Sequence, residues 1–269
     1  MFDGDLKALE KVVAYMKAHW PSKVKPEWQV RLDEYPAIAE KVFKDFTEGK
    51  TKKRHFMRIA GLSGSGKTTQ LLPATEAYFE AGKLKPVLVA ARRFVEYHPH
   101  FQEILDYYGE ENLRKMTDEF STIMMFMILV LTIRAGHDII LDVTLLDPSM
   151  EGILAGLLKE GQYDALLLMI AASPEVTEKH LGGRSWRHTR ETELEFIRAT
   201  KLAMDFYANE MSEMRVVLWN VYDSAPIYDG AAKNSVETFE KFSRIVDIPE
   251  HDEEVLREAK IRYLKNLGK

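Results

Sequence analysis

The segment Gly61-Leu62-Ser63-Gly64-Ser65-Gly66-Lys67-Thr68 most strongly limits what this chain can fold into, because it matches G-x-x-x-x-G-K-[ST]. Glycines allow a backbone to wrap closely around a phosphate with its N–H groups pointing inward. A helix that begins at the end of such a loop adds partial positive charge. An apolar segment at 56–60 precedes the loop, and a helical one follows it. We therefore predict a nucleoside-triphosphate site between a strand and a helix.

The chemistry of the loop residues suggests their roles. We predict that Lys67 places its ammonium on the β- and γ-phosphates and that the Thr68 hydroxyl binds Mg²⁺. The other residues expected to bind the nucleotide are Gly61, Ser63, Gly64, Ser65, Gly66 and Thr69. The alternative is an accidental glycine-rich loop, and the strand and helix on either side argue against it. ATP together with Mg²⁺ is the expected ligand pair.

From residue 55 onward, short apolar segments alternate with longer helical ones. We expect strands near 55–60, 86–91, 138–143, 165–171 and 215–219. We expect helices near 67–81, 98–108, 118–135, 149–160, 174–182 and 190–213. Such alternation indicates βαβ units. The predicted fold is therefore α/β and P-loop kinase-like, with a mainly parallel sheet and helices on both faces.

The first fifty residues are expected to be helical and separate from the α/β domain. Apolar residues recur at helical spacing from Leu6 to Met16, and a second helical stretch runs from about 29 to 46, with Pro36 as a start or a kink. We predict a helical N-terminal extension over 1–54 and a kinase domain over 55–269. These helices complete the core or, as a second hypothesis, pack over the nucleotide cleft as a built-in inhibitor. A last helix is expected to start near Asp247–Glu250.

Composition excludes several other classes of protein. The chain has 269 residues, of which 46% are hydrophobic and 29% charged, and it contains no cysteine. Disulfide scaffolds, thiolate metal sites and cysteine nucleophiles are therefore excluded. The apolar run at 123–131 is shorter than the ~18 residues of a membrane helix, and basic residues alternate with acids too evenly for a nucleic-acid stripe. We expect a cytoplasmic protein that binds neither membranes nor nucleic acid.

Three motifs that follow the loop carry a resemblance to a known family. They are F-x-x-x-H-P-x-F from Phe94 to Phe101, the strand end Asp142-Val143-Thr144, and the arginine-rich turn from Gly183 to Arg190. In this order, over about 56–229, they resemble the zeta toxin family of bacterial P-loop kinases. The resemblance implies transfer of the ATP γ-phosphate to the 3′-hydroxyl of UDP-N-acetylglucosamine. It also implies an antitoxin protein as a partner that blocks the nucleotide site.

The resemblance also implies roles for individual residues. Arg184 and Arg187 lie where the family clamps the transferring phosphoryl group, a task that suits guanidinium forks. The family's acidic base lies six positions before the histidine of the His-Pro pair, and that position here is Arg92, which cannot accept a proton. Asp142 is the first candidate for a replacement base or metal ligand, because a parallel strand delivers its end to the phosphate loop. A helix-capping role is the alternative for Asp142.

The acceptor is expected to lie near His98, Glu96 and Thr144. His98 either binds the substrate or stabilises the turn before Pro99, and Glu96 is either a weaker base candidate or a solvent-facing residue. For the arginine-rich turn, the alternative interpretation is a basic turn that is exposed to solvent. Two other functions also stay open. One is a P-loop kinase of another small hydroxyl compound, and the other is a catalytically degenerate ATP-binding protein.

Overall fold

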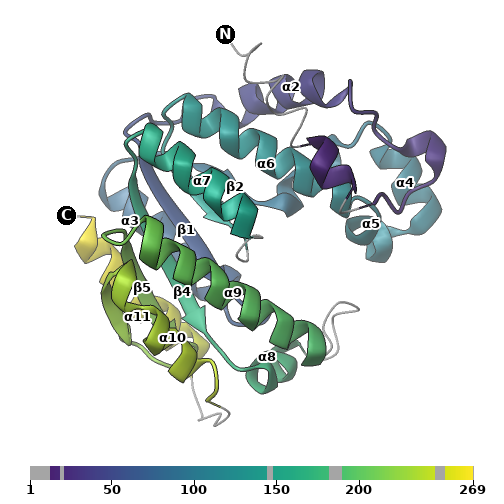
Figure 1. Cartoon of the computed structure of the whole chain (residues 1–269). Helices are drawn as coiled ribbons and strands as arrows, with labels where there is room; N and C mark the ends of the chain where they lie inside the picture. The colour runs from purple at the N-terminus through teal and green to yellow at the C-terminus, as the bar shows by residue number, and fades with distance from the viewer. Residues whose placement is uncertain (1–12, 19–20, 144–147, 182–189, 246–251, 269) are drawn as a thin grey trace. The chain divides into compact units, whose positions relative to one another are not determined.

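A computed structural model describes residues 13–18, 21–143, 148–181, 190–245 and 252–268 (Figure 1). The chain divides into two compact units. Unit 1 comprises Met1–Lys52 and Val87–His137, and unit 2 comprises Lys53–Pro86 and Asp138–Lys269. Residues 87–137, which are expected within the kinase domain, thus group with the first 52 residues. That residues 1–54 form an extension stays a prediction.

Unit 2 is built on a sheet whose strands follow the order β3-β1-β4-β5-β6. The first four of these strands run parallel, and β6 runs antiparallel to β5. Their bounds are β1 (His55–Gly61), β3 (Ile139–Asp142), β4 (Asp164–Ala171), β5 (Arg215–Asn220) and β6 (Tyr228–Ala231). The predicted mainly parallel sheet is confirmed. Strand β6 was not predicted, because its sequence Tyr-Asp-Gly-Ala lacks the alternation of apolar and polar residues that indicates a strand.

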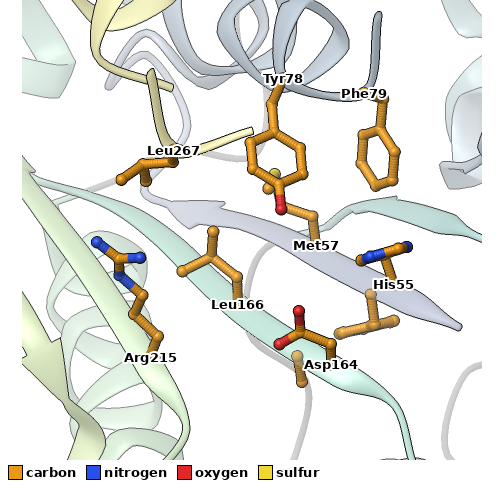
Figure 2. Close-up of a pocket in the computed structure, with 10 residues that line it drawn as sticks. His55, Met57, Tyr78, Phe79, Asp164, Leu166, Arg215 and Leu267 are labelled. Carbon is orange, nitrogen blue, oxygen red and sulfur yellow. The ribbon is translucent and has the colours of Figure 1, made fainter. Parts of the chain in front are cut away.

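Helices cover both faces of this sheet, as predicted. The helices of unit 2 are α3 (Leu72–Ala81), α7 (Pro148–Glu160), α8 (Pro174–Leu181), α9 (Arg190–Glu210), α10 (Val236–Phe242) and α11 (Glu253–Leu267). Successive side chains of a strand point to opposite faces. Accordingly, Leu167 and Met169 of β4 pack with Met204 of α9, whereas Leu166 faces Tyr78 of α3 on the other side (Figure 2).

The final helix begins a few residues later than expected. Asp252 is its N-cap and accepts hydrogen bonds from the backbone N–H groups of Glu254 and Val255. The predicted start at 247–250 lies outside the described residues. The sequence pattern thus predicted the helix but not its first turn.

Unit 1 consists mainly of helices. Its elements are a helical segment at 13–18, η1 (Pro26–Trp28), α2 (Tyr35–Thr47), β2 (Val87–Val89), η3 (Ala91–Tyr97), α4 (Phe101–Tyr108), α5 (Glu110–Met116) and α6 (Asp118–Arg134). Pro36 lies in the first turn of α2, where a backbone N–H is not needed, so it marks a start and not a kink. Helix α4 begins at Phe101 and not at His98, because Pro99 disfavours a helical conformation in the residue before it and His98 is extended.

Helix α6 is the centre of unit 1. All its residues from Ile123 to Ile133 are buried, as expected for a helix that is apolar on every side. Lys17 attaches the segment at 13–18 to this helix through an ion pair with Glu119 at 3.0 Å. None of the described helices is by itself long and apolar enough to cross a membrane; α5 and α6 would pass that test only as a pair bent by 57°.

A buried network of polar side chains joins β1 to two helices of unit 2. Arg58 of β1 donates to Glu151 of α7 at 2.5 Å and to the hydroxyl of Tyr207 of α9 at 3.0 Å, and that hydroxyl donates to Glu151. All three side chains are at most 2% exposed. Burial lowers the pKa of Arg58, but Glu151 and Tyr207 outweigh it and raise that pKa above its usual value. Arg58 therefore stays charged inside the protein.

We expect Glu151→Gln to lower the free energy of unfolding by about 3–5 kcal/mol, because it deprives a buried guanidinium of its counter-charge. The triple variant Arg58→Met, Glu151→Leu, Tyr207→Phe replaces the network by apolar groups and should recover most of that loss. Urea unfolding of both variants and the wild type measures the two effects. A single Gln variant as stable as the wild type would contradict this account.

Candidate nucleotide-binding site

The predicted phosphate loop connects β1 to a helix, as its sequence requires. Strand β1 ends at Gly61, and the helix begins as a single π-turn, η2 (Lys67–Leu71), that continues into α3. The N–H of Leu72 donates to the Lys67 carbonyl, five residues back. Pro73 follows this turn directly, in the first turn of α3, where a backbone N–H is not needed. Such π-turns occur frequently at functional sites.

Three positions in the loop require glycine. Gly61 has φ +141°, and a Cβ there would lie 2.8 Å from the carbonyl oxygen of Ile170 in β4. Gly64 and Gly66 have φ +76° and +91°, in the left-handed region that residues with side chains avoid. The backbone shape of this loop therefore depends on its glycine spacing and not only on its composition.

The polar groups of the loop are placed for an anion. The Lys67 ammonium lies within the loop and donates to the carbonyls of Gly61 at 2.6 Å and Leu62 at 2.7 Å. The Ser65 hydroxyl is buried and makes no hydrogen bond within the described part of the chain. Thr68 is exposed on the first turn of the helix, where its hydroxyl can reach a ligand. These features fit a phosphate group with an associated cation.

Asp142 lies at the end of the strand next to the loop. Strand β3 pairs with β1 in parallel, and Asp142 is the register partner of Ile59, two residues before Gly61. Its side chain is only 6% exposed. Helix α7 begins at Pro148, so Asp142 does not hold the capping position directly before it. Strand β3 therefore ends beside the strand that leads into the loop.

A histidine that the sequence analysis did not single out contacts the loop. The Nδ1 of His180, in α8, lies 3.0 Å from the carbonyl oxygen of Gly64. A carbonyl only accepts hydrogen bonds, so Nδ1 is the protonated nitrogen. The ring of Tyr222 meets the His180 ring edge-on, with 5.9 Å between centroids. No sequence signal identifies a lone histidine 116 residues from the glycine that it contacts.

The remaining predicted residues are not all in unit 2. Glu96 and His98 belong to unit 1, where Glu96 is exposed in η3 and His98 is 4% exposed. Arg184, Arg187 and Thr144 lie outside the described residues. The structure thus brings together the loop, Lys67, Thr68 and Asp142 within unit 2, and places Glu96 and His98 in the other unit.

His98 is a neutral histidine held by its surroundings. Its Nδ1 accepts the backbone N–H of His100 at 3.1 Å, so the proton of the neutral ring is on Nε2. Phe120 packs edge-on against the ring, with centroids 4.7 Å apart. Burial, and then the charge of His100, lowers the pKa of His98 to about 4. At neutral pH His98 can therefore donate one hydrogen bond but carries no positive charge for a phosphate.

A separate cavity of about 70 Å³ lies at the opposite end of the same strands (Figure 2). His55, Asp164 and Arg215, the first residues of β1, β4 and β5, line it. Nucleotides and other small molecules occupy several hundred Å³, and ligands of parallel sheets bind beyond the carboxyl ends of the strands. This cavity has room for a few water molecules and is not the nucleotide site.

The chain is similar to known proteins over most of its length. The family model described as zeta toxin matches residues 39–255. A chain of the PezAT chromosomal toxin–antitoxin system of the human pathogen Streptococcus pneumoniae is 18% identical, with a TM-score of 0.63 over 90% of this chain and 99% of that one. A chain of the AvrRxo1-ORF1:-ORF2 complex with ATP is 14% identical, with a TM-score of 0.52 over 88% and 89% of the two chains. The curated proteins contain no match.

We expect Gly61→Ala to weaken ATP binding by at least tenfold, because the new Cβ meets the backbone of Ile170. Gly156→Ala, in α7, is the matched control, since a Cβ there has no atom within 4 Å. That change should leave ATP binding intact and stabilise the helix by up to about 1 kcal/mol. Calorimetric titration with ATP and thermal unfolding measure these effects. Equal ATP affinities of the two variants would contradict the requirement for glycine at position 61.

Acid should destabilise the protein through His98. His98 takes up a proton near pH 6.5 in the unfolded chain and only near pH 4 in the folded chain. The contribution of neutral His98 to the free energy of unfolding is therefore fully present above pH 6.5 and is lost as the pH falls from 6.5 to about 4. Between pH 7 and pH 4, the free energy of unfolding of the wild type should fall by about 3 kcal/mol more than that of His98→Asn. Urea unfolding at several pH values measures the difference. A difference that does not change with pH would show that His98 titrates normally.

Proposed function

We propose that this chain, which belongs to the zeta toxin family, transfers the γ-phosphate of ATP to a hydroxyl group of a small metabolite. The observation that carries the proposal is the glycine-dependent loop with the Lys67 ammonium inside it and Asp142 on the adjacent strand. Loop, lysine and carboxylate are the parts that phosphoryl transfer requires for positioning and charge neutralisation. ATP is the donor, and UDP-N-acetylglucosamine is the acceptor that the family resemblance suggests.

The described residues fit ATP with Mg²⁺. The backbone N–H groups of the loop and Lys67 would hold the β- and γ-phosphates, and Thr68 with Asp142 would hold the ion directly or through water. When bound, Mg²⁺ neutralises negative charge on the phosphate oxygens. The buried Ser65 hydroxyl supplies one further polar group at the loop.

Acceptor activation must differ from the family pattern, because Arg92 stands at the position of the acidic base. Arg92 cannot accept a proton, and Asp142 is the carboxylate that we propose in its place. The loose transition state of phosphoryl transfer needs little proton abstraction, so a carboxylate that orients the hydroxyl is sufficient. Arg184 and Arg187 would clamp the transferring group. His98, Glu96 and Thr144 are proposed to contact the acceptor.

A protein partner is part of this proposal. One structurally similar chain comes from a toxin–antitoxin system, and a second comes from a two-component complex with ATP. These likenesses support an antitoxin that binds this chain. An acceptor such as UDP-N-acetylglucosamine would place the protein in the cytoplasm.

Transfer of labelled phosphate from ATP to UDP-N-acetylglucosamine tests the proposed function. Lys67→Ala should abolish both ATP binding and transfer, because it removes the charge within the loop. Asp142→Asn should lower transfer about 100-fold or more and change ATP affinity much less, because the amide keeps the shape but neither accepts a proton nor binds Mg²⁺ well.

Each other outcome has a distinct meaning. If phosphate is transferred only to another hydroxyl compound, the proposed kinase activity stands and the proposed acceptor is wrong. ATP binding that depends on Lys67, with no transfer to any acceptor in a panel of nucleotide sugars, sugars and antibiotics, would replace the kinase by an ATP-binding protein. Transfer that survives Lys67→Ala would contradict the assignment of the loop.

A further inference from the structure

We infer that His180 is a positioning residue of the phosphate loop: its hydrogen bond to Gly64 selects the loop conformation that binds phosphate. This inference rests on the proposed function, because it concerns the same ATP site. It adds a residue from α8 that the sequence pattern of the loop does not contain. The contact joins two parts of the chain that are 116 residues apart.

The peptide unit between Gly64 and Ser65 is the element that His180 controls. A trans peptide is planar, so its C=O and N–H point in opposite directions. The Gly64 C=O points to His180, while the Ser65 N–H donates to the Leu62 carbonyl at 3.2 Å. The Lys67 ammonium bonds to that same carbonyl at 2.7 Å. The N–H of Ser65 therefore points to the side of the loop on which the lysine charge lies.

The glycine makes this orientation easy to reverse, so the weak internal bond of the Ser65 N–H at 3.2 Å benefits from a second partner outside the loop. Gly64 has φ +76° and no Cβ, so rotation of its following peptide unit meets little steric resistance. In the reversed orientation the carbonyl would face the Lys67 side and repel a phosphate. A hydrogen bond from the outside of the loop opposes that reversal. His180 supplies it at 3.0 Å.

The position of His180 is itself supported by the loop that follows β5. Tyr222 of this loop packs edge-on against the His180 ring. The N–H of Val221 donates to the Ala171 carbonyl at 3.3 Å, and the Lys260 ammonium of α11 donates to the Asp223 carbonyl at 3.0 Å. Lys260 is fully buried, so the loop is attached to the helix from within the protein. The loop that packs against His180 is thus itself held by hydrogen bonds to β4 and α11.

Three variants at position 180 separate positioning from simple packing. His180→Asn carries a donor near the place of Nδ1, His180→Gln carries one near the place of Nε2, and His180→Leu carries none. We expect Asn to keep ATP affinity within about threefold of the wild type. Leu and Gln should lose about tenfold, which corresponds to one net hydrogen bond of about 1.4 kcal/mol.

Two measurements make the test decisive. Calorimetric titration with ATP, without any acceptor, gives the affinities, so failure of phosphoryl transfer does not affect the result. Amide hydrogen exchange of residues 62–66 without nucleotide should be faster in His180→Leu than in the wild type and close to wild type in His180→Asn. Equal ATP affinities and equal exchange in the Asn and Leu variants would overturn the inference, and so would a Leu variant that matches the wild type in both. Thermal unfolding of the three variants checks that each is folded.

Discussion

The close approach of the phosphate loop to β4 is the constraint on which the rest of unit 2 depends. At the end of β1 the backbone passes so near the Ile170 carbonyl that only a glycine fits. This contact exists because β1 lies between β3 and β4 in a parallel sheet, with all three carboxyl ends at one edge. The same arrangement brings Asp142 beside the loop. Sheet order and glycine spacing are thus two parts of one requirement.

Strand β1 also carries the charge that ties the sheet to its helices. Arg58 lies three residues before Gly61, and its ion pair with Glu151 and its hydrogen bond to Tyr207 link β1 to α7 and α9. Burying this group is costly unless every partner is in place, so the network favours a single packing arrangement of these elements. The strand that supports the phosphate loop is consequently held on one face by apolar packing and on the other partly by polar contacts.

Much of the site was predictable because local chemistry dictates it. The glycines, Lys67 and Thr68 lie within eight consecutive residues, and their predicted roles depend only on local backbone shape and charge, so their spacing alone predicts a phosphate loop. Asp142 was predictable only indirectly, because its place depends on first predicting a parallel strand from an apolar run that ends in a carboxylate. His180 was not predictable. Its role depends on a contact between α8 and Gly64, and nothing in the residues around either one encodes that pairing.

The sequence by itself determined the alternation of strands and helices, the mainly parallel sheet and the loop at the end of β1, because each depends on short-range patterns of apolar residues, glycine and proline. Only the tertiary structure decided the strand order, the pairing of β6 with β5, the grouping of 87–137 with the first 52 residues, and the contact of His180 with the loop. The physical reason is that these features arise from packing between segments far apart in the chain, whose free energy is a sum over many weak contacts and leaves no local pattern.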